Sequence, residues 1–445
     1  MHVGHGRGAA YGASLASLLT FASWDVTREY YVNDAGRQMD ILGLSTWLRY
    51  LEQNGVAVPF LPNAYQGSYV RDMAAQITAA HGQKYVRSAA AVLAGTPGLP
   101  EADRADDEAK RQRDQHLDAL IANAKELLGP DWVYVHQHAL SEQLADCRND
   151  LEEFGVHFDV WFSEKALFDT GLVARCVDLL EKAGHLYVQN GARWFRSTTF
   201  GDEKDRVVQR ENGLYTYFAS DIAYHLNKFE RGFDKVINIW GADHHGYISR
   251  VNGAITALGL DANKLQVALV QFAVLYRNGQ KASMSTRSGE FVTLRELRGE
   301  VGNDACRFFY ALRKSDQHLD FDLDLAKSQT NENPVYYIQY AHARICSVVN
   351  QWAGDFDGLA ESDLSLLTNP RELAIANQLA EFREVIEVAA RELAPHLIAF
   401  YLKDLAGEFH GWYNAERMLV DDAALKDARV ALAVAVRQVI CNGLT

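Results

Sequence analysis

The chain has 445 residues, a length that predicts two or three domains with substantial cores. Its 48% hydrophobic and 23% charged residues are typical of an ordinary globular protein, and no apolar run is long enough to cross a bilayer. The formal charge of −14 argues against indiscriminate binding of polyanions, although a local basic surface can still contact RNA.

The cysteines indicate the compartment. There are five of them, Cys147, Cys176, Cys306, Cys346 and Cys441, and no two form a Cys-x-x-Cys pair. This scatter predicts free thiols in a reducing environment rather than disulfides or a zinc site. No secretory signal is recognisable at the start, so we expect a cytoplasmic protein without a membrane partner.

Strand and helix patterns alternate through the first 300 residues. Apolar residues recur at helical spacing over 8–22, and 26–32 follow as a predicted strand. The run 236–240 predicts a buried strand, and 251–258 predicts a helix. This alternation favours an α/β fold with a doubly wound parallel sheet. A Pro/Gly cluster at 96–100 precedes a charged, alanine-rich stretch, which predicts an inserted helical excursion over 101–128.

A polar loop follows a second strand pattern. Residues 266–276 predict one strand, and Arg277-Asn278-Gly279-Gln280 predicts a tight turn. Lys281 to Gly289 is then small, polar and flexible in composition. Thr293-Leu294-Arg295-Glu296 predicts a capping box that opens a helix. Taken alone, this loop is best read as an exposed surface loop.

From residue 333 onward the pattern is helical only. Asn333-Pro334 is a cap followed by a first-turn proline, and further helices are predicted around 379–386, from Pro395 and over 430–440. A helical bundle behind an α/β sheet suggests a module that grips a larger partner. Core packing remains the better interpretation of most of its aromatic residues.

The chain opens with Met1-His2-Val3-Gly4-His5, ahead of a glycine-rich helical run. Two imidazoles beside free backbone N–H groups at a helix start suit the phosphates of a nucleotide. A His-x-Gly-His motif alone is weak. The loop Met284-Ser285-Thr286-Arg287 strengthens it, because Lys281 and Arg287 could close over a triphosphate and balance charge as pyrophosphate leaves.

A third cluster is Gly241-Ala242-Asp243-His244-His245, at the carboxyl end of the strand predicted over 236–240. Ligands bind at that edge of an open α/β sheet. The Asp-His-His run is also compatible with a metal centre of a phosphoesterase, but a metal centre needs further carboxylates that one run does not reveal.

The His-x-Gly-His motif and the loop Met284-Ser285-Thr286-Arg287 resemble the first and second signatures of class I aminoacyl-tRNA synthetases. The sequence around them is similar to the bacterial arginyl-tRNA synthetase family. The resemblance extends over nearly the whole chain. It includes the segments 30–38, 65–67, 302–307 and 333–344. It implies a class I Rossmann-type doubly wound sheet with insertions, followed by an all-α bundle.

The resemblance also implies the domain boundaries. We expect a catalytic domain over 1–60 and 130–300, an inserted helical region over 61–129, a connecting segment over 301–332 and an anticodon-binding bundle over 333–445. Family members carry an RNA-contacting domain and a strand ahead of the histidine signature, so we expect the first strand of the sheet to be missing. The second signature also departs from Lys-Met-Ser-Lys-Ser, with Arg287 or Ser288 at its last lysine position.

Site residues follow from the resemblance, position by position. The implied catalytic residues are His2, His5, Lys281 and Arg287. The implied ATP-binding residues are His2, Gly4, His5, Gly241, Asp243, His244, Met284, Ser285 and Thr286. The implied arginine-binding residues are Glu164, Tyr217, Asp221 and His245, and no residue is expected to bind a metal directly.

The choice of arginine has a physical basis, because a guanidinium is planar, always charged and best held by carboxylates. Tyr217 and Asp221 match the family's Tyr-x-x-x-Asp element, and helical spacing would place them on one side. Without the resemblance, Asp221 reads as an acid near a helix N-terminus and Glu164 as a solvated surface residue. His245 stands where some relatives have a glutamine, so its role is transferred with a change of residue type.

The implied activity is ATP-dependent ligation of L-arginine to tRNA(Arg) through an arginyl-adenylate. The partners are then ATP with its Mg²⁺, L-arginine and tRNA(Arg), and we expect a monomer. Two alternatives stay open at this point. One is a non-catalytic tRNA-binding relative, and the other is a metal-dependent phosphoesterase that uses Asp243, His244 and His245.

Overall fold

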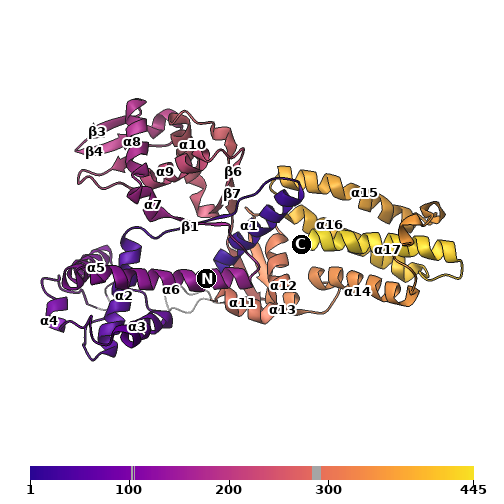
Figure 1. Cartoon of the computed structure of the whole chain (residues 1–445), viewed down its shortest axis with the longest axis horizontal. Coiled ribbons are helices and arrows are strands. Elements are labelled where there is room, and N and C mark those ends of the chain that lie inside the picture. The colour runs from indigo at the N-terminus through magenta and orange to yellow at the C-terminus, as the bar shows by residue number, and fades with distance from the viewer. Residues whose placement is uncertain (102–103, 105, 283–291) are drawn as a thin grey trace.

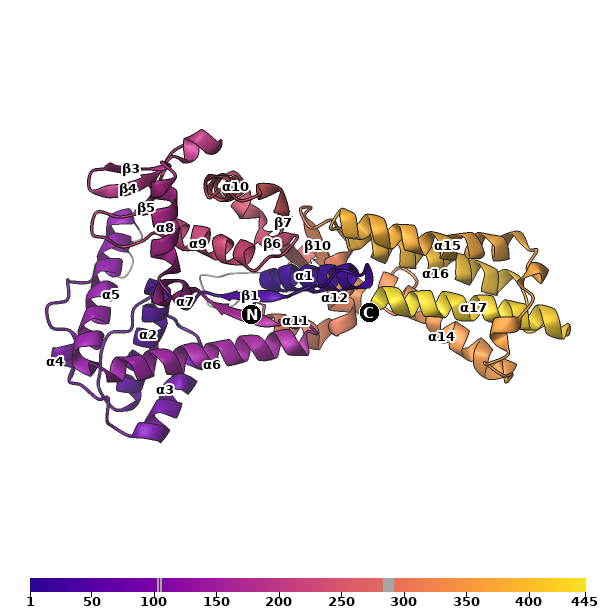
Figure 2. The same cartoon turned by 45° about the horizontal axis from the view of Figure 1, so that its top comes forward.

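The computed structural model describes residues 1–101, 104, 106–282 and 292–445. The molecule is elongated, with a helical unit at one end, an α/β region around helix α1 (Val3–Phe21) in the middle and a helical bundle at the other end (Figures 1 and 2). The start of the chain lies in the middle of the molecule (Figure 1).

The α/β region contains three parallel strand pairs. They are β1 (Glu29–Val32) with β2 (Val160–Ser163), β6 (Val236–Gly241) with β7 (Leu265–Val270), and β8 (Ala273–Arg277) with β10 (Leu319–Asp322). Helix α1 packs against β6 and β8, and β9 (Gln280–Lys281) joins β8 through an antiparallel turn. Parallel strands connected by helices are the arrangement expected from the alternating pattern.

One predicted strand was wrong, because residues 266–276 form two strands that belong to different sheets. β7 ends at Val270 and β8 begins at Ala273. Between them, the N–H of Gln271 donates to the Ser315 carbonyl at 2.8 Å, and the Gln271 carbonyl accepts from Arg7 at 2.8 Å. At Gln271 these bonds to distant segments replace the strand pairing. The chain therefore changes direction there, so that β7 pairs with β6 and β8 pairs with β10.

The other elements of this region agree with the sequence pattern. The strand at 236–240 and the helix at 251–258 are β6 and α10 (Ile248–Ala257), while β1 starts only at Glu29. The predicted tight turn is confirmed, since Asn278 and Gly279 have φ of 51° and 70°, as a hairpin turn with the type I′ twist requires.

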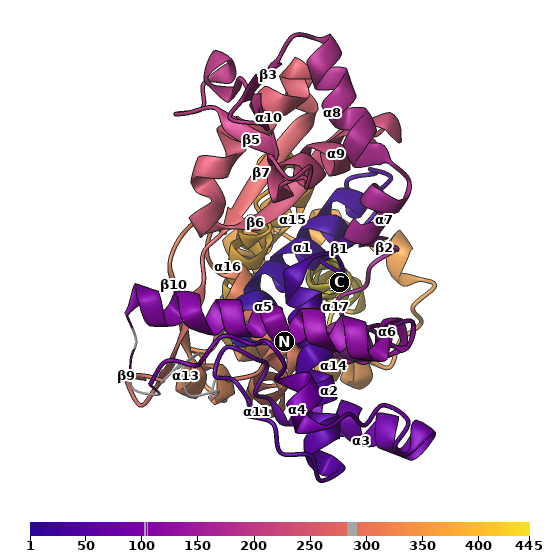
Figure 3. The same cartoon turned by 90° about the vertical axis from the view of Figure 1, so that its left-hand side faces the viewer.

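A small lobe projects beside the strand pairs and is drawn at the top of Figure 3. Its antiparallel sheet consists of β3 (Leu186–Gln189), β4 (Ala192–Phe195) and β5 (Arg206–Gln209). Its helices are α7 (Glu164–Asp169), α8 (Leu172–Lys182), α9 (Tyr217–Glu230) and α10. The apolar core packs α8 and α9 together, and this packing fixes the direction in which α9 presents its side chains.

The inserted helical unit has its own core. Its helices are α2 (Arg37–Gln53), α3 (Ser68–His81), α4 (Ala89–Val92), α5 (Asp107–Leu128) and α6 (Asp131–Glu153). Buried side chains of α2 and of the first turns of α6 belong to this core, so the unit extends on both sides of the interval 61–129. Helix α6 then continues from this unit to the α/β region (Figure 2).

The C-terminal part is helical. Helices α11 (Leu294–Val301), α12 (Asn303–Ala311) and α13 (Leu323–Lys327) connect the α/β region to the bundle. The bundle consists of α14 (Pro334–Trp352), α15 (Pro370–Arg391), α16 (His396–Ala415) and α17 (Ala423–Leu444). The predicted cap is confirmed, because the Asn333 side chain accepts from two backbone N–H groups of the first turn of α14. Within the described part of the chain, no helix has the length and apolar character needed to span a membrane.

Candidate active site

The two N-terminal histidines lie together at the start of α1. His2 caps the helix, and its Nδ1 accepts the N–H of Gly4 at 2.9 Å. The His5 ring stacks on the His2 ring with centroids 3.8 Å apart. Burial, and next the neighbouring His2 ring, lower the pKa of His5 to about 4. His5 is therefore neutral at pH 7, with one ring nitrogen as a hydrogen-bond donor.

A cavity of about 1140 Å³ opens along one side of α1. On this side the helix contributes mostly glycine and alanine, so its backbone is open to a ligand. The cavity also contacts α9, β6 and β1. Of the expected site residues, it is lined by Gly4, His5, Asp221, Gly241, Asp243 and His244. Side chains from three distant parts of the sequence thus meet in one cavity.

The same cavity continues between β1 and β6. Each of these strands pairs with another partner, and among the described residues no ladder joins the two. Their facing edges, 27–33 and 235–241, belong to the cavity wall. The volume exceeds that of a typical small-molecule pocket, which is roughly 300–1,000 Å³, because it combines this slot with the space beside His5.

The described residues on either side of the second signature are bonded to the start of α1 and to β8. The N–H of Val3 donates to the Val292 carbonyl at 3.2 Å, and His2 forms an antiparallel bridge with Thr293. On the other flank, Ala282 donates to the Leu275 carbonyl at 2.8 Å. Met284, Ser285, Thr286 and Arg287 lie outside the described residues. Lys281 is exposed on β9 and does not line the cavity.

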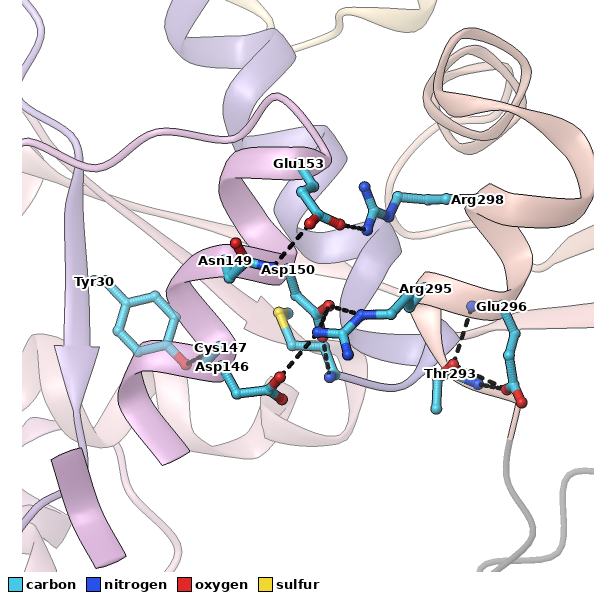
Figure 4. Close-up of polar contacts among 11 residues, drawn as sticks. Tyr30, Asp146, Cys147, Asn149, Asp150, Glu153, Thr293, Arg295, Glu296 and Arg298 are labelled. Atoms are coloured by element: carbon cyan, nitrogen blue, oxygen red, sulfur yellow. Dashed lines mark hydrogen bonds and ion pairs between the residues drawn. The ribbon is translucent and has the colours of Figure 1, made fainter. Parts of the chain in front are cut away.

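The helix after the second signature is fixed to α6. Its predicted capping box is confirmed, because the Thr293 and Glu296 side chains bond each other's backbone N–H groups. Figure 4 shows Arg295 bonded to Asp146 and Asp150 of α6, each at 2.9 Å. Since Asp150 is buried, this ion pair holds the start of α11 firmly against the C-terminal end of α6.

Tyr217 and Asp221 both lie on α9, four residues apart, as the helical spacing predicts. Asp221 is half-buried in the cavity wall and accepts a hydrogen bond from the Tyr247 hydroxyl. Burial raises the pKa of Asp221, and the Tyr247 bond opposes that rise. The Tyr217 side chain is 62% exposed and lies outside the cavity lining.

Glu164 is the first residue of α7 and is only 3% exposed, so it is not a solvated surface residue. Its carboxylate accepts from the Ser220 hydroxyl at 3.1 Å and from the phenol of Tyr31. Burial raises the pKa of Glu164. The Glu164 carboxylate interacts electrostatically with Asp221, but only Asp221 lines the cavity, so Glu164 lies behind its wall.

The third cluster follows β6 at its carboxyl end, as expected. Asp243, His244 and His245 lie in the short 3₁₀ helix Ala242–Tyr247 and are exposed. Asp243 and His244 line the cavity, whereas His245 does not. Within the described ranges, no group of three or more His, Cys, Asp or Glu side chains is arranged to hold a metal ion.

Sequence reasoning missed several residues of this site. Tyr31 and Tyr247 hold the two carboxylates from neighbouring elements. Lys228 lies in the cavity wall and donates to Asn238 at 2.8 Å. Tyr31 lies in the segment 30–38 that carried the resemblance, and that segment was the only signal available. A tyrosine or lysine in a helix or strand pattern otherwise looks like any amphipathic residue.

Comparison with known proteins identifies the family. The family described as "tRNA synthetases class I (R), catalytic domain" matches residues 1–69 and 134–343. The family described as "DALR anticodon binding domain" matches residues 338–445. The break in the first match falls within the inserted helical unit, and the second match covers the bundle.

Individual relatives agree with this result. An arginine–tRNA ligase of Dechloromonas aromatica is 90% identical over all of this chain and 76% of its own length, and one of an Azoarcus species is 74% identical with the same coverage. A putative arginyl-tRNA synthetase structure from Campylobacter jejuni has a TM-score of 0.85 and 31% identity, over all of this chain and 88% of that one. The chain is thus a member of the class I arginyl-tRNA synthetase family.

Proposed function

We propose that this chain catalyses the ATP-dependent ligation of L-arginine to tRNA(Arg). The observation that carries the proposal is the cavity at α1, where Gly4 and His5 face Asp221 and the turn after β6. The high identity of the arginine–tRNA ligases over the whole chain supports the same activity. The metal-dependent phosphoesterase alternative receives no support from the arrangement of Asp243, His244 and His245.

In the first step, a carboxylate oxygen of arginine attacks the α-phosphorus of ATP. The bond from that phosphorus to the bridging oxygen breaks, and pyrophosphate leaves with the electron pair, which gives arginyl-adenylate. The neutral His5 donates a ring N–H to the phosphate, and the N–H groups at the start of α1 add a favourable dipole. Mg²⁺ enters bound to the phosphates of ATP and neutralises their charge.

We assign the arginine subsite to the α9 side of the cavity. Asp221 pairs with the guanidinium, and Tyr217 closes the subsite from the solvent side of the same helix. Glu164 adds a second negative charge behind the wall, held through Ser220 and Tyr31. Two carboxylates near one cavity favour a permanently charged, planar cation over a neutral side chain. We place His245 near the amino end of arginine.

We assign ATP to the other half of the cavity. Gly241, Asp243 and His244 at the end of β6 lie where an open α/β sheet binds a nucleotide. From the family resemblance we also assign to ATP the loop that carries Met284, Ser285, Thr286 and Arg287, together with Lys281. Its flanks support this assignment, because Val292 and Thr293 bond directly to the first residues of α1.

In the second step, the terminal adenosine of tRNA attacks the arginyl carbonyl carbon through its 2′-hydroxyl. The bond between the carbonyl carbon and the phosphate oxygen breaks, AMP leaves with its electron pair, and the hydroxyl proton passes to solvent. We propose that the bundle α14–α17 holds the anticodon end of the tRNA. On its surface, Arg344 lies over the rings of Tyr340 and Tyr413 at 4.3 and 4.7 Å. A guanidinium on aromatic rings is a suitable platform for unstacked RNA bases.

We further propose that the protein acts as a cytoplasmic monomer. Five free cysteines, none of them in a disulfide, suit a reducing compartment. One chain supplies His5, Asp221 and both flanks of the second signature, which supports a site formed within a single chain. Sedimentation of the purified protein with and without tRNA would measure its assembly state.

The decisive test is ATP–pyrophosphate exchange dependent on arginine, run with and without tRNA(Arg). It should be run on this chain and on a version extended at its N-terminus. Arginine-dependent exchange in either version supports the proposal. Binding of tRNA(Arg) without exchange in both versions would instead identify a non-catalytic relative. Exchange that responds to another amino acid and not to arginine would contradict the assigned substrate.

A further inference from the structure

Arg7 lies on the side of α1 that faces away from the cavity. Its side chain is among the largest fully buried ones of the described chain, and the residue is only 1% exposed. Gly4, His5 and Gly8 on the same helix line the cavity, but Arg7 does not. A buried guanidinium so close to the His-x-Gly-His motif therefore has a role other than touching the ligand.

The guanidinium of Arg7 donates to three backbone carbonyls from two other segments. Nη1 donates to the carbonyls of Gln271 and Gln317, both at 2.8 Å, and Nη2 donates to that of Lys314 at 3.0 Å. No ion pair of Arg7 with a carboxylate is found among the described residues. Burial lowers the pKa of Arg7 to about 10, so it remains charged at neutral pH.

These carbonyls belong to the corner between β7 and β8 and to the loop that leads into β10. The two segments are also bonded to each other, since the Gln271 N–H donates to the Ser315 carbonyl at 2.8 Å. Arg7 thus completes a junction of α1, the β7–β8 corner and the 312–318 loop. A planar guanidinium with several donors can satisfy three carbonyls at fixed angles.

The corner held by Arg7 forms part of the proposed ATP site. Phe272 lies at this corner, is 48% exposed and lines the cavity. A Cβ on Gly4 would come within 3.0 Å of the Phe272 ring, so this ring is packed onto the His-x-Gly-His motif. Directly after the corner, β8 runs to β9 and to Ala282, which precedes the second signature.

We propose that Arg7 is a positioning residue for adenylate formation, because its guanidinium aligns the Phe272 corner and strand β8 with the histidine end of α1. The inference rests on the proposed function. Without the three bonds, the carbonyls of Gln271 and Gln317 lose the donor that Arg7 supplies, and the Lys314 carbonyl keeps only the N–H of Gln317. The corner is then free to move relative to Gly4 and His5, and both the cavity wall and the base of the second signature lose their fixed position.

The test uses two variants and a matched control. Arg7→Met keeps the length of the side chain and removes all its donors, while Arg7→Lys keeps a cation with a compact donor group that does not span three carbonyls. Lys314→Ala removes an exposed side chain but keeps the carbonyl that accepts from Arg7. Circular dichroism and thermal unfolding of each variant report whether it folds.

The first readout is amide hydrogen exchange, which does not depend on activity. We expect the amides of 271–277 to exchange at least tenfold faster in Arg7→Met, with an intermediate effect in Arg7→Lys. The bundle α14–α17 and the Lys314→Ala control should match the unaltered protein. Unchanged exchange of 271–277 in a folded Arg7 variant would overturn the proposal. If Arg7→Met does not fold, Arg7→Lys decides.

The second readout is the kinetics of arginine-dependent ATP–pyrophosphate exchange. In Arg7→Met we expect a lower kcat and a higher KM for ATP, so that kcat/KM for ATP falls at least tenfold. The KM for arginine should stay within twofold of the unaltered value. A general loss of structure would lower the active fraction and leave both KM values unchanged. Kinetics of a folded variant within twofold of the unaltered protein would refute the role. Absence of exchange in the unaltered protein contradicts the proposed function instead, and amide exchange still tests whether Arg7 holds the corner.

Discussion

Asp221→Asn should weaken arginine binding far more than ATP binding. Asp221 is the acid of the proposed guanidinium subsite, half-buried in the cavity wall and bonded by Tyr247. Asparagine has nearly the same shape, and its amide oxygen can still accept from Tyr247. The substitution therefore removes the negative charge and leaves the arrangement of α9 in place.

The expected size follows from the burial of the charge. Two unit charges 4 Å apart attract each other by about 4 kcal/mol at an effective dielectric constant of about 20. The remaining dipole of the amide recovers part of that energy, so we expect a loss of about 3 kcal/mol, within the roughly 2–5 kcal/mol observed for buried charge pairs. At 1.4 kcal/mol for each factor of ten, the Kd for arginine should rise by about 100-fold.

Isothermal titration calorimetry with each ligand measures this effect, and the Kd for ATP should change less than threefold. Glu230→Gln is the matched control. It neutralises an exposed carboxylate at the far end of the same helix, where Glu230 pairs with Arg175. An arginine Kd for Asp221→Asn within threefold of the unaltered value would refute the assignment of the guanidinium subsite to α9.

Four further predictions concern other parts of the molecule. His5→Ala should lower the rate of adenylate formation by about 100-fold or more, as loss of one donor to a developing oxyanion does, with tRNA affinity unchanged by filter binding; equal exchange rates would reject its role. Glu164→Gln should raise the Kd for arginine by about tenfold, because a charge behind the wall acts at longer range than Asp221; a larger effect than that of Asp221→Asn would reverse the two assignments. Arg344→Ala should weaken binding of tRNA(Arg) and reduce its salt dependence, without changing arginine-dependent exchange measured at saturating tRNA; unchanged affinity would remove this face from the tRNA interface. Burial lowers the pKa of His225 to about 3. As the pH falls, the unfolded chain therefore takes up a proton at this histidine before the folded chain does. The free energy of unfolding then decreases as the pH drops from 6.5 towards 3. Between pH 7 and 5, the free energy of unfolding of His225→Gln should therefore decrease by about 2 kcal/mol less than that of the unaltered protein, as measured by urea titration. Equal decreases in the two proteins would contradict the burial effect.

The sequence by itself determined the local features of the fold. The capping box at Thr293, the cap at Asn333 and the hairpin turn at Asn278-Gly279 are all present. Each depends on residues within four positions of one another, so the pattern of residue types contains the necessary information. The cavity residues His5 and Asp221 were also predicted from the sequence, because each lies in a short motif that resembles one of the family's motifs.

Tertiary structure alone decided where the sheets begin and end, and which groups support the site. The continuous apolar pattern of 266–276 concealed the break at Gln271, because its backbone bonds to Arg7 and Ser315, which lie far away along the chain. Likewise, the burial of Glu164 results from packing against Ser220 and Tyr31. Local patterns report propensity and periodicity, whereas buried polar groups are satisfied by partners that only the folded chain brings within hydrogen-bond distance.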